Sequence, residues 1–186
     1  EWALLEPGGS TGGEASGGYD LSSVRTGIMA GSPCPASVMT KLIEAGIGEM
    51  TICYGMTETS PVSTQTRTDD SFERKVGTVG AVHPHLEVKV VDPVTRETLP
   101  RGEAGEFCTK GYSVMIGYWN EPEKTAEALR DGWLHTGDVG VVDNQGFVRI
   151  TDRMKDIIIT AGGKNITPSE FENQLKFSPY VSDAVV

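Results

Sequence analysis

The chain has 186 residues, 38% of them hydrophobic and 23% charged, which is typical of a globular protein with a buried core. A formal net charge of −10 argues against a nucleic-acid partner, because phosphates favour a basic face. No apolar run approaches the roughly 18 residues of a membrane-spanning helix, and the N-terminus lacks the basic start and apolar middle of a secretory signal. We therefore expect no transmembrane segment and a cytoplasmic location.

The cysteines and histidines do not predict a metal site. Cys34, Cys53 and Cys108 are odd in number and widely spaced, which fits neither a disulfide framework nor a zinc cluster. We expect reduced, mostly buried thiols. His83 and His85 form a His-x-His pair, but no further ligands stand at metal spacing, so loop histidines are the simpler interpretation.

The first part of the chain predicts a strand–helix–strand unit. Residues 8–18 are too rich in glycine for regular structure, and they lack the lysine of a phosphate-binding loop. Residues 24–29 then predict a short strand, 35–46 a helix with proline at its start and glycine at its end, and 50–53 a second strand. Such a βαβ unit implies a parallel sheet with ligand groups at the strand ends.

The second strand ends in a segment suited to a nucleotide. Tyr54 offers a ring for stacking, and Gly55 allows close backbone approach. Thr57 offers a hydroxyl donor for a phosphate oxygen, and Glu58 offers an acid for the magnesium ion that accompanies a triphosphate. Taken alone, the segment is better explained as an ordinary strand-to-loop turn with a satisfied threonine and a solvated glutamate.

From about residue 76 the sequence favours antiparallel sheet or a small barrel, because short strand-like runs alternate with turns. These runs are residues 87–91, 105–109, 137–142 and 147–150. One helix interrupts them. We expect Asn120 to cap it, Glu123 to complete a capping box, Pro122 to lie in its first turn and Gly132 to follow its end.

The later segments contain two further candidates. Asp138, expected to open the strand at 137–142, could accept both hydroxyls of a ribose, although a turn aspartate is equally consistent. Residues 152–156 are a charged cluster between apolar strands at 147–150 and 157–160. Such a cluster is either a solvated connection or a hinge between two cores. Beyond it we expect a glycine turn, a helix capped by Thr167 and the start of another strand.

Four segments, in this order, resemble the adenylate-forming superfamily, also called AMP-binding enzymes, which includes acyl-CoA synthetases, firefly luciferase and peptide-synthetase adenylation domains. They are Tyr-Gly-Met-Thr-Glu-Thr-Ser-Pro at 54–61, Gly-Tyr-Trp-Asn-Glu-Pro-Glu-Lys-Thr at 117–125, Gly-Trp-Leu-His-Thr-Gly-Asp at 132–138 and the run at 152–170. The resemblance covers nearly the whole chain from about residue 20 and is closest to fatty-acyl-CoA synthetases.

The resemblance implies a mixed α/β fold. Residues 1–154 would form the later part of the large N-terminal domain, with a parallel βαβ part to about residue 70 and a small antiparallel β-barrel from about residue 76. Residues 155–186 would contain the hinge and the start of a small α+β C-terminal domain. The family's upstream phosphate loop and downstream lysine are missing, so we expect a fragment that is a poor catalyst alone.

The resemblance also implies roles for individual residues. The nucleotide site would be formed by Gly31, Ser32, Pro33, Tyr54, Gly55, Met56, Thr57, Asp138 and Arg153. Within it, Tyr54 would stack on adenine, Thr57 would hold the α-phosphate, and Asp138 and Arg153 would bind the ribose. Glu58 would bind Mg²⁺, Lys155 would be the hinge, and Gly162 and Gly163 would shape the tunnel for the pantetheine arm of CoA.

The implied reaction is ATP-dependent activation of a carboxylic acid, fatty in kind, to acyl-AMP, followed by transfer to CoA. The products would be acyl-CoA, AMP and pyrophosphate, and the reaction would need ATP, Mg²⁺ and CoA. Two alternatives stay open: an adenylation domain that loads a carrier protein, and a non-catalytic nucleotide-binding module. The acid, its chain length and a homo-oligomeric state are left open by the sequence.

Overall fold

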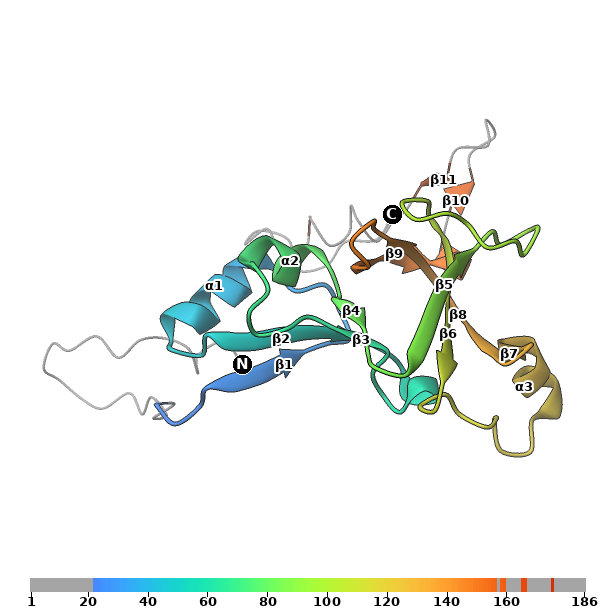
Figure 1. The fold of residues 1–186 in the computed structure, drawn as a ribbon, viewed down its shortest axis with the longest axis horizontal. Coiled ribbons are helices and arrows are strands. Elements are labelled where there is room, and N and C mark those ends of the chain that lie inside the picture. Colours follow the sequence, from blue (N-terminus) through green and yellow to red (C-terminus); the bar gives the residue numbers. More distant parts are fainter. Residues whose placement is uncertain (1–21, 157, 160–164, 167–174, 176–186) are drawn as a thin grey trace, which may run out of the picture.

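The structure is a computed structural model that describes residues 22–156, 158–159, 165–166 and 175. Its mixed α/β fold contains sheets of four, five and two strands (Figure 1), which confirms the expected fold class. The expectations for residues 8–18, for the helix capped by Thr167 and for the final strand lie outside the described residues. Within the part that the structure describes, no helix combines the length and hydrophobicity needed to cross a bilayer.

The four-stranded sheet begins with the expected βαβ unit. β1 (Thr26–Met29) and β2 (Glu49–Tyr54) pair in parallel, and α1 (Ala36–Glu44) connects them. The helix ends in a Schellman motif, because the Gly46 N–H bonds to Ile43 O and the Ile47 N–H to Leu42 O, with Gly46 at a φ of +88°. The core beneath α1 consists of Cys34, Met39, Ile47, Met50 and Ile52.

This sheet then continues in the antiparallel sense through β3 (Thr64–Gln65) and β4 (Ala81–Val82). Between them lies α2 (Phe72–Gly77), whose first turn is capped by the Ser71 hydroxyl, an acceptor for the Arg74 N–H. These elements are too short to produce a readable hydrophobic period, so the sequence does not predict them.

The five-stranded sheet is antiparallel and curls into a half-barrel. β5 (Leu86–Val91) and β6 (Gly105–Gly111) precede α3 (Pro122–Ala128), and β7 (Leu129–Arg130), β8 (Trp133–Val142) and β9 (Val148–Arg153) follow it. β8 is central: β6 pairs along one edge, and β7 and β9 share the other. Val90, Phe107 and Val148 form its core. The antiparallel second half is therefore confirmed.

A bulge interrupts the pairing of β6 with β8. Glu106 faces Val139 and Cys108 faces His135, so two residue steps on β6 span four steps on β8. Gly137, at a φ of +70°, lies in the extra segment, and its left-handed backbone is one that glycine adopts without strain.

Three local expectations near α3 are wrong. Glu121, not Asn120, is the N-cap, no side chain caps the helix there, and Asn120 has a φ of +54°. The Thr125 hydroxyl instead ties the helix start together, because it donates to Glu121 O and accepts the Tyr118 N–H. Glu123 therefore completes no capping box, whereas Pro122 does lie in the first turn. Gly132 follows β7 in the turn to β8, not the helix end.

Two further boundaries differ from expectation. β8 begins at Trp133, so Asp138 lies inside the strand and does not open it. The cluster at 152–156 is the end of β9 followed by the 3₁₀ turn η3 (Met154–Asp156). Beyond it, β10 (Ile158–Ile159) pairs with β11 (Asn165–Ile166).

Backbone hydrogen bonds join the two large sheets. The Val79 N–H donates to Val148 O, and the Val148 N–H donates to Gly80 O, both at 2.8 Å. Gly80 has a φ of +82°, and a Cβ built there would lie 1.9 Å from the carbonyl carbon of Gln65. The chain can therefore pass between the sheets only with glycine at this position.

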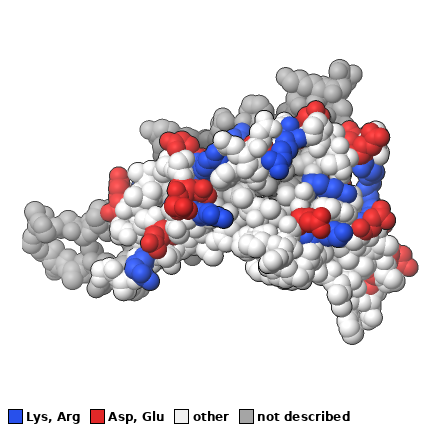
Figure 2. All heavy atoms as spheres, viewed as in Figure 1, with Lys and Arg blue, Asp and Glu red and all other residues white. Residues whose placement is uncertain are grey.

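Charged side chains are interspersed over the face drawn in Figure 2, where acidic and basic residues alternate and form no basic patch. This face consequently offers no surface of the kind that tracks a nucleic-acid backbone.

We predict that Gly80→Ala lowers the free energy of unfolding by about 2–4 kcal/mol, because the new methyl group meets backbone atoms that cannot move aside. Gly77→Ala is the matched control: a Cβ there meets no atom within 4 Å, so the change should stay within about 1 kcal/mol. Urea-induced unfolding measures both. Equal stability of the two variants would contradict the close approach at Gly80.

Candidate functional site

A cavity of about 500 Å³ lies between the end of the four-stranded sheet and the half-barrel. The lining comes from the turn after β1, the end of β2, the end of α2 with the residues that follow it (75–79), the facing parts of β8 and β9, and the 3₁₀ turn after β9. Most of the predicted nucleotide-binding residues are among the lining residues, namely Gly31, Ser32, Pro33, Tyr54, Gly55, Met56, Asp138 and Arg153. The structure therefore brings together residues that lie more than a hundred positions apart in the sequence.

The parallel pairing of β1 with β2 explains half of this arrangement. Parallel strands end at the same edge of a sheet, so the turn at 31–33 and the segment at 54–56 lie side by side. Gly31 has a φ of +85°, which turns the chain sharply after β1. At Gly55, a Cβ would lie 1.8 Å from Pro61 O, so only glycine lets the chain fold back there.

The half-barrel contributes the opposite wall through Asp138 and Arg153. The Tyr54 hydroxyl donates to Asp138 Oδ2 at 2.5 Å, and Arg153 Nε lies 3.7 Å from Asp138 Oδ1. The rings of Tyr54 and Phe107 form a T-shaped pair at an interplanar angle of 90°, with centroids 5.4 Å apart. A half-buried aromatic ring, a buried carboxylate and an exposed guanidinium thus meet at one end of the cavity.

Burial dominates the electrostatics of this group. It raises the pKa of Asp138, although the Tyr54 hydrogen bond and the Arg153 charge both act to lower it. Burial and the nearby Asp138 charge also raise the pKa of Tyr54 well above its ordinary value. Tyr54 consequently keeps its proton at neutral pH and serves as a hydrogen-bond donor to Asp138.

Thr57 and Glu58 follow the lining residue Met56 but are not themselves part of the lining. They lie in the 3₁₀ turn η2 (Thr57–Thr59), which the buried Thr59 holds by accepting the Met56 N–H at 2.9 Å. With Thr59 in the structural role, the Thr57 hydroxyl is left exposed. The sequence did not distinguish these two threonines, because both follow the same strand within two positions of each other.

Glu58 is tied to the loop between β6 and α3. Its Oε1 accepts the Tyr118 hydroxyl at 2.8 Å, and its backbone carbonyl accepts the Met115 N–H at 2.8 Å. The hydrogen bond to Glu58 raises the pKa of Tyr118. The half-buried carboxylate of Glu58 and the exposed hydroxyl of Tyr118 place oxygen atoms side by side. Oxygen ligands suit Mg²⁺, which binds one or two carboxylates and completes its coordination shell with water and phosphate oxygens.

The remaining predicted residues lie at or beyond the edge of the described part. Lys155 is exposed in η3 and does not line the cavity, whereas the adjacent Asp156 does. Gly162 and Gly163 lie outside the described residues. The structure adds Thr151 and the buried Asp152 to the lining. Asp152 was missed because it opens the charged cluster at 152–156, which favoured a solvated connection.

We predict that Tyr54→Phe raises the pKa of Asp138 further, because it removes a hydrogen bond to the charged carboxylate. A pKa above the unfolded value means that the stability contributed by Asp138 is complete below the unfolded pKa and is lost as pH rises through the folded pKa. In Tyr54→Phe this loss should extend to higher pH.

Carbon-13 NMR titration of the Asp138 carboxyl, assigned with Asp138→Asn, measures this shift. Tyr118→Phe is the matched control, since its hydroxyl bonds to Glu58 and not to Asp138. An Asp138 pKa that moves equally in both variants would show that the Tyr54 hydrogen bond does not hold the carboxylate.

Comparison with known proteins gives the family. The chain is 54% identical over 170 residues to YngI of Bacillus subtilis (strain 168), which is named as an acyl-CoA synthetase; the match covers 90% of this chain and 31% of the relative. It is 49% identical over 170 residues to the mitochondrial medium-chain acyl-CoA ligase ACSF2 of Danio rerio, covering 90% of this chain and 28% of that protein.

A solved structure agrees in fold. The O-succinylbenzoate coenzyme A synthetase MenE of Bacillus subtilis, in complex with AMP, superposes with a TM-score of 0.79 at 34% identity, covering 89% of this chain and 33% of MenE. The chain thus spans about a third of the length of the proteins it matches. The sequence pattern of the family described as AMP-binding enzyme matches residues 3–119. The chain belongs to the AMP-binding enzyme family.

Proposed function

We propose that the protein containing this chain activates a carboxylic acid with ATP and transfers the resulting acyl group to CoA. The observation that supports this most directly is the group of Tyr54, Asp138 and Arg153 at one end of the cavity, in a member of the AMP-binding family. The similarity to acyl-CoA synthetases and ligases supports the same reaction.

The nucleoside half of ATP is held by the residues that meet in the cavity. Adenine lies between the turn formed by Gly31, Ser32 and Pro33 and the face of the Tyr54 ring, which packs against Phe107 in a T-shaped pair. The ribose hydroxyls donate to the Asp138 carboxylate, which Tyr54 and Arg153 already orient. Because these partners are in place before ATP arrives, little ordering is needed on binding.

The phosphates lie beyond Met56, where the chain leaves the cavity. The exposed Thr57 hydroxyl donates to an α-phosphate oxygen, and Glu58, oriented by Tyr118, holds Mg²⁺. When bound, Mg²⁺ stabilises the negative charge that develops on the phosphate oxygens. Gly55 lets the backbone approach this region closely.

The chemistry follows from this alignment. A carboxylate oxygen of the acid attacks the α-phosphorus, the bond to the β-phosphate oxygen breaks, and pyrophosphate leaves. Thr57 stabilises the oxygens that gain charge, while Tyr54 and Asp138 keep the nucleoside fixed so that attack is in line. The thiol of CoA then attacks the acyl carbonyl carbon, loses its proton, and displaces AMP to give acyl-CoA.

The two half-reactions need different groups over one site, so a rotation between them is expected. Lys155 is the proposed hinge: it is exposed, and it follows the last lining residues of β9. Gly162 and Gly163, outside the described residues, are proposed to shape the tunnel for the pantetheine arm.

The acid is proposed to be a fatty acid, in keeping with the medium-chain acyl-CoA ligase of Danio rerio. The cytoplasmic location stays a prediction, since that same relative is named as mitochondrial. Thioester formed on a carrier protein in place of CoA would favour the adenylation-domain alternative.

Acid-dependent exchange between ATP and pyrophosphate tests the first half-reaction in the full-length protein. Glu58→Ala or Thr57→Ala should each lower the exchange rate by about 100-fold, the scale for one contact made in the transition state. Glu87→Ala, which removes an exposed carboxylate on β5, is the matched control and should exchange normally. Normal exchange in the Glu58 and Thr57 variants would refute their assigned roles, and no exchange in the unaltered protein would favour a non-catalytic module.

Nucleotide affinity tests the adenine assignment separately. Tyr54→Ala should weaken ATP binding by about 10- to 100-fold, because stacking of a base on an aromatic ring contributes about 1–3 kcal/mol. Tyr54→Phe keeps the ring and should lose less. Isothermal titration calorimetry measures both, and an equal loss in the two variants would assign the effect to the hydroxyl instead of the ring.

A further inference from the structure

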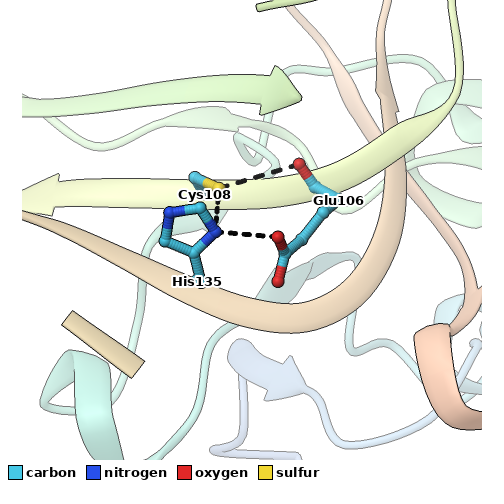
Figure 3. A group of neighbouring side chains, drawn as sticks. All are labelled: Glu106, Cys108 and His135. Carbon is cyan, nitrogen blue, oxygen red and sulfur yellow. Dashed lines mark hydrogen bonds and ion pairs between the residues drawn. The ribbon is translucent and has the colours of Figure 1, made fainter. Parts of the chain in front are cut away.

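A second group of polar side chains lies in the half-barrel and has no role in the proposed reaction. The side chains of Glu106 and Cys108 on β6 approach the ring of His135 on β8 (Figure 3). His135 Nδ1 lies 2.7 Å from Glu106 Oε2 and 3.5 Å from Cys108 Sγ. One ligand atom from each residue falls within 4.8 Å of the others.

The β6–β8 bulge creates this group. Glu106 and Cys108 are two residues apart on one strand, so they point to the same face. In an uninterrupted antiparallel ladder they would face residues two apart on β8, but here their partners Val139 and His135 are four apart. The additional residues of β8 bend the strand, and both β6 side chains reach the single imidazole. Sequence spacing gives no sign of this convergence.

The distances suit a tetrahedral divalent cation. Zinc bonds of about 2.3 Å to sulfur and about 2.0–2.2 Å to nitrogen and oxygen give ligand-to-ligand distances of about 3.4–3.6 Å. The separation of Cys108 Sγ from His135 Nδ1 is 3.5 Å, within that range without any movement. The separation of Glu106 Oε2 from His135 Nδ1 would need to widen by about 0.7 Å, which a rotation of the flexible glutamate side chain supplies.

The donor types also select the cation. Sulfur favours zinc and similar thiophilic ions over magnesium, and imidazole and carboxylate complete a set of three protein ligands with one position left for water. A thiolate, a carboxylate and a neutral imidazole carry two negative charges, so a dication leaves the buried group without net charge. The side chains of His135 and Glu106 remain 11% and 12% exposed, which provides a path for the ion.

The same geometry argues against a nucleophilic role for Cys108. The Cys108 thiol and the Glu106 carboxylate both approach Nδ1 of His135. In a catalytic triad, the acid would orient the histidine through one ring nitrogen while the other nitrogen takes the proton of the thiol. Burial, together with the Glu106 charge, raises the pKa of Cys108 to about 12, and its side chain is fully buried. A bound cation, in contrast, displaces the thiol proton outright.

We propose that Glu106, Cys108 and His135 bind one thiophilic divalent cation of the zinc type, which ties β6 to β8 at the bulge. The site is distinct from the Glu58 position of the proposed Mg²⁺ and does not depend on the proposed reaction. Because Asp138 lies three residues beyond His135 on the same strand, the cation would also hold the segment that carries this carboxylate.

Titration of the full-length, chelator-treated protein with CoCl₂ tests the proposal, because tetrahedral Co²⁺ bound to a thiolate gives an intense sulfur-to-metal charge-transfer band. We expect one Co²⁺ per chain with this band, and its loss when ZnCl₂ is added. Cys108→Ser should abolish the band. Cys34→Ser is the matched control, since it removes another buried thiol outside the group, and it should keep the band.

Two further variants address the other ligands and any loss of folding. Glu106→Gln and His135→Gln should each weaken Zn²⁺ binding by at least about 100-fold, beyond the range seen when only an outer partner of a ligand is lost. Competition with a chromophoric chelator measures this, and circular dichroism checks that the variants fold. Zinc should also raise the melting temperature of the unaltered protein. Absence of the cobalt band in the unaltered protein, or a band that survives Cys108→Ser, would overturn the proposal whatever the other variants do.

Discussion

The hydrogen bond between Tyr54 and Asp138 is the contact on which the site depends. It joins the last residue of a strand in one sheet to the middle of a strand in the other, 84 positions along the chain. Without it, the two walls of the cavity would lose their side-chain hydrogen bond inside the site, and the buried carboxylate would lack the Tyr54 hydroxyl as a donor. The cost of burying Asp138 is therefore offset in part by the Tyr54 hydroxyl, and the same side chain lines the cavity with an aromatic ring.

The bulge in the half-barrel gives this contact its position. Gly137 permits the irregular backbone immediately before Asp138, which pairs with Arg153 of β9, and a second register shift follows between Val139 and Gly140. One local departure from the ladder thus serves two places: it sets the carboxylate at the cavity, and three residues earlier it gathers Glu106 and Cys108 around His135. The irregular part of β8 therefore positions side chains in both groups.

The sequence predicts the larger elements because their periods are long enough to read. The βαβ unit, its glycine stop at Gly46 and the antiparallel second half follow from hydrophobic pattern and turn residues. Short elements such as α2 are not predicted from the sequence. The start of α3 is also predicted wrongly, because the Thr125 hydroxyl makes the hydrogen bond there in place of the expected asparagine cap. Most of the predicted nucleotide-binding residues do line the cavity, but the link from Tyr54 to Asp138 and the burial of Asp152 depend on tertiary pairing, which no local pattern encodes.

The paired backbone bonds of Val79 and Gly80 with Val148 have a consequence for engineering. They join the residues directly before β4, the last strand of the first sheet, to β9 of the half-barrel, so the two sheets are linked by main-chain hydrogen bonds and not only by side-chain packing. A chimaera that exchanges one sheet between relatives must therefore inherit both partners from one parent, or carry glycine at position 80 in each. A chimaera whose junction follows residue 91 would keep every element intact, but it would take Val79 and Gly80 from one parent and Val148 from the other.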